Sequence, residues 1–184
     1  RNSANTGFDP RVDLTATLAP NGAAIADFNG DGRADLVIVS ASGSASLLYR
    51  NAGNTGFDPA VNISLPTTNA IPVAAGDFNG DGRQDLAVGY SFDNRVSVYL
   101  RKADNSGFDT PVNLTVDANT RSIAVGDFNN DGRQDIATVN FVAGSAYVLL
   151  RTADNTGFNS PVSFGVGSGP QSLAVGDFNG DNRQ

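Results

Sequence analysis

One acidic segment occurs four times along the chain at a constant interval. It begins every 50 residues, at Asp27, Asp77, Asp127 and Asp177. A Gly-Phe dipeptide preceded by Asn-Thr or Asn-Ser recurs with nearly the same period, at Gly7, Gly56, Gly107 and Gly157. A period of this length is typical of proteins in which each repeat is one supersecondary unit. The chain is therefore expected to fold as a row of similar units.

Each period contains four short runs with the composition of β-strands. In the third period these runs are 122–128, 134–140, 145–151 and 158–166, and turn residues separate them. The first two runs are almost continuously apolar, which is typical of strands covered on both faces. The fourth run alternates, with Val112, Leu114 and Val116 on one face of the second copy. We expect the first two strands deep inside the fold and the fourth at its periphery.

A four-stranded unit of about 50 residues is what a β-propeller blade requires. The composition agrees, because Gly, Asn, Val and Thr are abundant and Glu is absent. The sequence therefore predicts one all-β domain over 1–184, with about three complete blades of four antiparallel strands and an extra strand at each end. Since blades close into rings of roughly 4 to 8, we expect the remaining blades of a longer chain, or further copies of this one, to complete the ring.

Composition also excludes several functions. The chain has no His and no Cys, which removes Ser-His-Asp and Cys-His catalysis and thiolate metal sites. Its net charge is -7 with a single Lys, whereas nucleic-acid-binding surfaces carry clustered basic residues. No apolar run reaches the length needed to cross a bilayer. We therefore expect neither nucleic-acid binding nor membrane insertion.

The repeated segment has the pattern of a loop that binds a hard cation. In the first copy, side-chain oxygens stand at positions 1, 3, 5 and 9, on Asp27, Asn29, Asp31 and Asp35. Calcium takes about 6 to 8 oxygen ligands, and the carbonyl of Arg33 and water can supply the rest. Position 6 is Gly in the first three copies and Asn in the fourth, the residues that adopt a positive φ most easily. The loop is therefore predicted to bind Ca²⁺.

The other three copies offer equivalent ligands. The second copy supplies Asp77, Asn79, Asp81, the Arg83 carbonyl and Asp85. The third supplies Asp127, Asn129, Asp131, the Arg133 carbonyl and Asp135. The fourth supplies Asp177, Asn179, Asp181 and the Arg183 carbonyl. The printed sequence ends one residue before the ninth position of the fourth copy, so we expect that site to be weak or empty.

The acidic loop has two other possible interpretations, an EF-hand and a metal-free hairpin turn. An EF-hand needs flanking helices and a Glu at position 12, where this chain has Ile38, Val88 and Thr138. Alternatively, Asn-Gly-Asp-Gly forms a tight hairpin turn without any metal. The carboxylates would then repel one another within a short loop, so calcium is the better interpretation. The Phe at position 2 of each loop and the Phe after each repeated Gly are expected to pack in the core and between blades.

These loops, followed by Asp-Leu-Val, Asp-Leu-Ala or Asp-Ile-Ala, resemble the FG-GAP or VCBS repeats of integrin α-subunit propellers and many secreted bacterial proteins. The resemblance covers the whole chain. It implies a ring, most often of seven blades, with calcium in the hairpin between the first two strands of a blade. It also implies an extracellular, secreted or cell-surface location.

The favoured function is calcium-stabilised recognition or adhesion, with a carbohydrate or protein as ligand. The alternative is the propeller domain of a secreted polysaccharide-degrading enzyme. Outside the acidic loops, Asp13, Asp93 and Asp117 stand singly at different places in their repeats. Catalysis by a pair of carboxylates is therefore poorly supported, and we expect the chain not to be an enzyme.

The connections at the end of the blades opposite the acidic loops differ among the copies. Binding residues concentrate on such variable loops of a rigid scaffold. Within them, aromatic and basic side chains are the candidate ligand contacts, namely Tyr90, Phe92, Arg95, Arg121 and Phe141. The alternative is that these loops vary because nothing constrains them.

Overall fold

The computed structural model describes residues 13–14, 16, 19–181 and 184. These residues form three antiparallel sheets of four strands. The first contains β1 (Pro20–Ala26), β2 (Asp35–Ser40), β3 (Ser44–Leu48) and β4 (Val61–Ser64). The second contains β5 (Ala70–Gly76), β6 (Asp85–Tyr90), β7 (Arg95–Tyr99) and β8 (Val112–Thr115). The third contains β9 (Thr120–Gly126), β10 (Asp135–Asn140), β11 (Ser145–Leu149) and β12 (Val162–Gly165).

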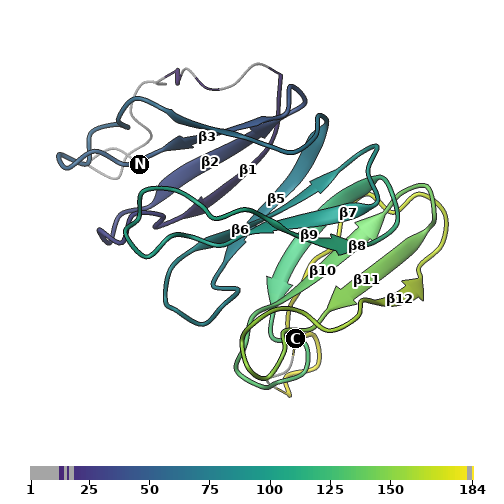
Figure 1. Cartoon of the computed structure of the whole chain (residues 1–184). Coiled ribbons are helices and arrows are strands. Elements are labelled where there is room, and N and C mark those ends of the chain that lie inside the picture. Colours follow the sequence, from purple (N-terminus) through teal and green to yellow (C-terminus); the bar gives the residue numbers. More distant parts are fainter. Residues whose placement is uncertain (1–12, 15, 17–18, 182–183) are drawn as a thin grey trace, which may run out of the picture.

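Each sheet is a simple meander in which consecutive strands are neighbours. The three sheets lie side by side in chain order from one side of the molecule to the other (Figure 1). The first strand of each sheet is the innermost, because β5 contacts both β1 and β9. This arrangement is that of consecutive propeller blades, and the predicted fold class is confirmed.

The core lies along the second and third strands of each blade. All six residues of β6 are buried, and Val37 and Val39 of β2 are fully covered. The outer strands β4, β8 and β12 are largely exposed, as the alternating pattern predicted. The prediction is wrong for β1, whose Ile25 is 71% exposed. Its apolar run is uncovered because no described sheet packs against the outer side of the first blade.

The two extra strands have different outcomes. The one before β1 falls largely on residues outside those that the structure describes. The one after β12 was predicted as a single inner strand, and no strand is formed between 170 and 177. In the other repeats the equivalent segment pairs with the strand that follows the acidic loop. No described strand pairs with 170–177, and Phe178 is 87% exposed.

Adjacent blades are joined by pairs of phenylalanine rings. Phe28 of the first blade packs edge-on against Phe108 of the second, with 6.4 Å between ring centroids. Phe78 and Phe158 form the equivalent pair between the second and third blades at 6.0 Å. Phe28 and Phe78 are almost completely buried. The predicted roles of both sets of phenylalanines are confirmed at these two boundaries.

Candidate metal centres

Each acidic loop connects the first two strands of its blade and is closed by its first carboxylate. In the first loop, Oδ1 of Asp27 accepts hydrogen bonds from the backbone N–H groups of Gly30 (2.7 Å) and Asp31 (3.1 Å). Its Oδ2 accepts one from Gly32 (2.7 Å). Gly32 has a φ of 80°, which few residues other than Gly tolerate. The second loop repeats these bonds with Asp77 as the acceptor.

Burial and hydrogen bonding act in opposite directions on this first carboxylate. Burial raises the pKa of Asp27, but the backbone N–H groups of Gly32, Gly30 and Asp31 together outweigh it and lower the pKa below its ordinary value. The same balance lowers the pKa of Asp127. The loop therefore holds its first carboxylate in the charged form, which is the form that a metal requires.

The Asp at position 9 is buried and tied to the backbone at two places. Oδ2 of Asp85 accepts a bond from the N–H of Phe78 (2.7 Å), and Oδ1 accepts one from the N–H of Arg101 (2.7 Å). Asp35 and Asp135 make the same pair of bonds in their blades. These carboxylates therefore hold the loop to the end of the third strand.

Burial, together with the charges of Asp81 and Asp77, raises the pKa of Asp85 to about 6, although the two backbone hydrogen bonds act to lower it. The pKa of Asp35 and of Asp135 is raised for the same reasons. Three carboxylates of one loop are thus close enough to repel one another. A cation among them would remove that repulsion.

The carboxylate at position 5 lies against the arginine at position 7. Asp81 forms an ion pair with Arg83 at 2.5 Å, and it also accepts a bond of 2.7 Å from the amide of Asn79. The pairs Asp31–Arg33 and Asp131–Arg133 are alike. Among the residues that the structure describes, no three acidic side chains converge on a common point. To share one cation, the Asp at position 5 would have to turn away from its arginine.

The donor set nevertheless fits calcium in type and number. Asp27, Asn29, Asp31 and Asp35 present only oxygen within one short loop, and the first carboxylate is already held charged. The residue types present therefore fit calcium, and the predicted ligand set stays a prediction. In the fourth loop, Asp177 accepts bonds from Gly180 (2.7 Å) and Asp181 (3.1 Å) as in the other copies. Its predicted ligand Arg183 lies outside the described residues.

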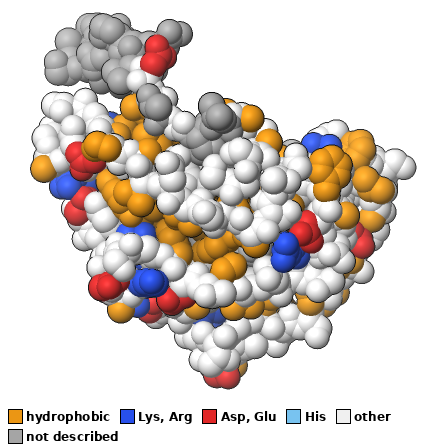
Figure 2. Space-filling view, turned by 45° about the horizontal axis from the view of Figure 1, so that its top comes forward, with side chains coloured by type: hydrophobic (Ala, Val, Ile, Leu, Met, Phe, Trp, Pro, Cys, Tyr) orange, Lys and Arg blue, Asp and Glu red, His pale blue; other side chains and the backbone are white. Residues whose placement is uncertain are grey.

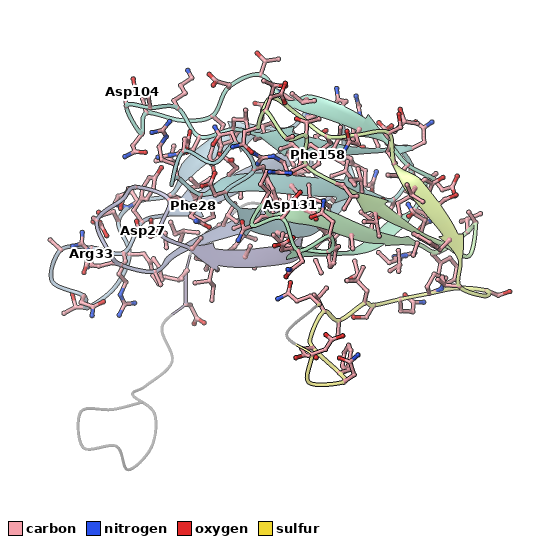
Figure 3. The ribbon with its side chains drawn as sticks, turned by 90° about the horizontal axis from the view of Figure 1, so that it is seen from below. Asp27, Phe28, Arg33, Asp104, Asp131 and Phe158 are labelled. Carbon is pink, nitrogen blue, oxygen red and sulfur yellow. The ribbon has the colours of Figure 1, made fainter. Side chains whose placement is uncertain are left out.

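The next blade contacts the first and the second loop each through a side chain that sequence reasoning did not single out. The guanidinium of Arg151 donates to the carbonyl of Asp77 (3.3 Å), and the amide of Asn105 donates to the carbonyl of Asn29 (2.9 Å). Arg101 and Arg151 are only 2% exposed. A basic residue directly after the apolar third strand, repeated at 50, 101 and 151, was the available signal. These contacts place the acidic loops and the Gly-Phe turns at the same end of the blades, as predicted (Figure 3).

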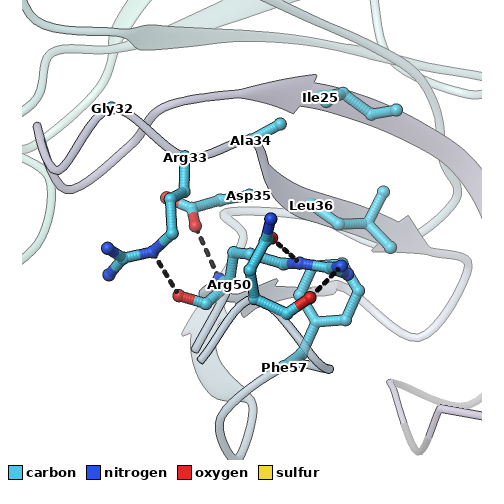
Figure 4. A pocket seen from close by; sticks show the side chains of 9 residues that line it. Ile25, Gly32, Arg33, Ala34, Asp35, Leu36, Arg50 and Phe57 are labelled. Atoms are coloured by element: carbon cyan, nitrogen blue, oxygen red, sulfur yellow. Dashed lines mark hydrogen bonds between the residues drawn. The ribbon is translucent and has the colours of Figure 1, made fainter. Parts of the chain in front are cut away.

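The first blade carries the same contact site without a described blade against it. Its pocket of about 530 Å³ is lined by Ile25, Arg33, Arg50, Asn54 and Phe57, among others (Figure 4). Arg50 donates to the side chain of Asn54 at 2.7 Å and lies over the ring of Phe57. Arg50, Asn54 and Phe57 occupy the positions at which Arg151, Asn155 and Phe158 meet the second acidic loop. The pocket therefore has the form of one half of a blade contact.

The predicted ligand contacts at the opposite end are only partly available. Tyr90 is 0% exposed and belongs to the core, so the expectation of an exposed ring is wrong. The sequence analysis placed Tyr90 in the connection over 90–95, but it is the last residue of β6. Phe92 is 80% exposed, and Arg95 beside it pairs with Asp93 at 2.8 Å. Arg121 lies over the ring of Phe141, 5.3 Å from its centroid.

Phe141 also lines a groove between two connections of the third blade. The β10–β11 connection contributes 141–144, and the segment after β12 contributes 167–169. Val142, next to Phe141, is 75% exposed. This end of the third blade therefore offers apolar and aromatic surface beside the guanidinium group of Arg121.

Blades of this form, joined through their inner strands and carrying an acidic hairpin loop, define a β-propeller protein. Residues 27–88 and 77–138 both match the FG-GAP-like repeat. The chain therefore belongs to the FG-GAP-like repeat family. A comparison with curated proteins found no match.

Solved structures show the same fold at low sequence identity. The crystal structure of BBS1N in complex with ARL6DN, soaked with lead, is 15% identical with a TM-score of 0.57. That match covers 89% of this chain and 48% of the other. The Dos1 propeller is 16% identical with a TM-score of 0.53, over 79% of this chain and 37% of the other. This chain thus spans less than half the length of either protein.

Where the structure describes the chain, it contains no helix with the length and hydrophobicity of a membrane-spanning segment.

Proposed function

We propose that this chain is a calcium-binding propeller module that recognises a carbohydrate or protein ligand outside the cell or at its surface. The observation that carries the calcium proposal is the geometry of the loops, in which oxygen-bearing side chains stand at positions 1, 3, 5 and 9 and backbone N–H groups hold the first carboxylate in place. Burial, and to a lesser extent the neighbouring carboxylates, raise the pKa of the Asp at position 9 in all three complete copies. A bound divalent cation would stabilise these carboxylates in their charged form.

An extracellular location is consistent with such loops. Calcium sites of extracellular modules have dissociation constants of about 10⁻⁴ to 10⁻³ M. Sites of that affinity fill only where calcium is abundant. The absence of Cys and His from the sequence leaves the proposal of binding rather than catalysis as the simpler one.

The surface proposed for the ligand is the end of the blades opposite the acidic loops. Phe92 and Val142 are exposed there and Phe141 is half-buried, with Arg95 and Arg121 beside them. Aromatic rings beside charged groups suit both sugar rings and protein side chains. On the face drawn in Figure 2, hydrophobic side chains gather in the middle and at one end, and basic side chains are few. That distribution supports a ligand other than nucleic acid.

The remaining blades of the ring are proposed to meet this chain at its two open sides. At one side lies the pocket of Arg50 and Phe57. At the other lies the third acidic loop, where Asp127, Phe128 and Asn129 border a second pocket. The partner is either further chain or a second copy.

Isothermal titration calorimetry of the chain with CaCl₂ tests the calcium proposal directly. We expect saturable binding of about three ions, with MgCl₂ binding more weakly because magnesium demands a stricter octahedral geometry. Replacing Asp31, Asp81 and Asp131 by Ala together should abolish the signal. If the unmodified chain gives no saturable binding up to several millimolar, the loops are hairpin turns and the proposal is wrong.

A further inference from the structure

Two glutamines contact the first residue of an acidic loop in the repeat that precedes their own. The backbone N–H of Asp77 donates to Oε1 of Gln134, 57 residues further along the chain, at 2.6 Å. The N–H of Asp127 donates to Oε1 of Gln184 at 3.1 Å in the same way. Gln134 stands at position 8 of its own loop, next to the buried Asp135. The loops that begin at Asp77 and Asp127 are thus each bonded to the repeat that follows them.

The residue before each loop explains why this bond can form. A Cβ placed on Gly76 would lie 2.6 Å from Oε1 of Gln134, so any larger residue would displace the glutamine. The φ of Gly76 is not in the left-handed region, so the backbone conformation alone does not demand glycine there. The space for the glutamine is therefore the reason for the glycine.

The first repeat lacks this arrangement. Ala26 stands where the later repeats have Gly76, Gly126 and Gly176. Gln84 is present in the second blade, and no hydrogen bond joins it to Asp27 although the structure describes both residues. Since a Cβ on Gly76 would lie 2.6 Å from the glutamine oxygen, the methyl group of Ala26 is expected to keep Gln84 from making the equivalent bond. The chain therefore contains an untied loop at Asp27 that can be compared directly with the tied loop at Asp77.

The two loops have identical proposed ligands. Positions 1 to 7 read Asp-Phe-Asn-Gly-Asp-Gly-Arg in both, and position 9 is Asp35 in one and Asp85 in the other. A difference in calcium affinity between them must therefore come from position 8, which is Ala34 or Gln84, or from their surroundings.

We propose that Gln134, a residue of the third blade, is a positioning residue for the calcium loop of the second. The inference rests on the calcium binding proposed above. The bond fixes the backbone of Asp77, whose side chain closes the loop through Gly80, Asp81 and Gly82. Fixing the first ligand before the ion arrives lowers the ordering cost of binding. By linkage, calcium in the second loop holds the third blade more firmly against the second.

The first loop has no such tie and is expected to bind calcium more weakly. One neutral hydrogen bond corresponds to a difference of roughly two- to tenfold in affinity. Movement of the third blade against the second would then weaken calcium binding at the loop that begins at Asp77. Calcium binding at the loop that begins at Asp27 would be unchanged.

The test is a calcium titration of the full chain followed by ¹⁵N NMR, which reads each loop separately. The reporters are the amide signals of Gly32 and Gly82, which donate to Asp27 and Asp77 at 2.7 and 2.8 Å. In the unmodified chain, Gly82 should respond at a lower calcium concentration than Gly32. Gly76→Ala should raise the midpoint at Gly82 by about two- to tenfold and leave Gly32 in place.

Three further variants guard against misfolding and provide the reverse experiment. Gln134→Met has a similar shape without the acceptor and should act as Gly76→Ala does, whereas Gln84→Met should change neither signal. Ala26→Gly should allow Gln84 to reach Asp27 and lower the midpoint at Gly32. A midpoint at Gly82 that is the same in the unmodified chain, Gly76→Ala and Gln134→Met would overturn the inference and leave calcium binding intact.

The absence of any calcium response at Gly32 and Gly82 in the unmodified chain would instead remove the calcium proposal, and with it this inference. The tie itself has a readout that does not depend on calcium. Amide hydrogen exchange at Asp77 should speed up in both Gly76→Ala and Gln134→Met. Unchanged exchange at that amide in both variants would show that the bond does not exist in solution.

Discussion

The carboxylate of Asp85 accepts a 2.7 Å hydrogen bond from the backbone N–H of Arg101, sixteen residues further along the chain. Its other oxygen accepts from Phe78. Asp85 therefore stabilises the blade whether or not a metal is bound, whereas Asp81 contacts only residues of its own exposed loop.

This difference separates two proposed calcium ligands. Asp85→Ala leaves two buried N–H groups without a partner and should lower the free energy of unfolding by about 2–4 kcal/mol, even in excess chelator. Asp81→Ala should cost less than about 1 kcal/mol in chelator and remove the calcium-dependent stabilisation of the second loop. Urea unfolding with and without calcium measures both. Equal losses for the two variants in chelator would contradict the structural role of Asp85.

Removing calcium should destabilise the chain through binding linkage. For a site with a dissociation constant of about 10⁻⁴ M, 1 mM calcium contributes about 1.4 kcal/mol. Three such sites contribute about 4 kcal/mol, which corresponds to a Tm change of roughly 10 °C in a chain of this size. Differential scanning calorimetry in 1 mM CaCl₂ and in excess EGTA gives the comparison. Identical melting in the two buffers would count against all three sites.

The contact between blades should depend on the ring pair Phe78–Phe158. Phe158→Ala removes a ring that packs against the almost completely buried Phe78 and should cost about 2–4 kcal/mol. The matched control is Phe57→Ala at the same position in the first blade, where the described residues show no ring partner. Its cost should be smaller by at least about 1 kcal/mol. Chemical denaturation of both variants decides the point, and equal costs would mean that the ring pair contributes little.

Substitution of Tyr90 should lower stability, whereas substitution of Phe92 should weaken ligand binding and leave stability nearly unchanged. Tyr90→Ala empties a core position and should cost about 3–5 kcal/mol. Phe92→Ala removes a side chain that is 80% exposed and should change stability by less than about 0.5 kcal/mol.

Any ligand of the variable face should then bind the Phe92→Ala and Phe141→Ala variants more weakly. A glycan array, followed by titration of the variants with a bound glycan, measures this. Unchanged affinity in both variants would place the binding surface elsewhere on the molecule.

The sequence by itself determined the repeat, the strands and the loop chemistry. Each of these depends on residues that are close in the chain. The alternation of Val112, Leu114 and Val116 reports a strand with one covered face, and the spacing from Asp27 to Asp35 sets the donors within one hairpin. Local geometry follows from local spacing, so the fold class and the candidate ligands could be predicted.

Only the tertiary structure decided how one blade acts on the next. The bond from Asp77 to Gln134 spans 57 residues, and that from Arg151 to Asp77 spans 74. Both depend on the rotation between neighbouring sheets, which no local pattern encodes. For the same reason the sequence misjudged Tyr90, because its burial comes from the packing of the first blade against the second. The difference between Ala26 and Gly76 can be read from the sequence. Its consequence depends on Gln134, which only the tertiary structure places beside Gly76.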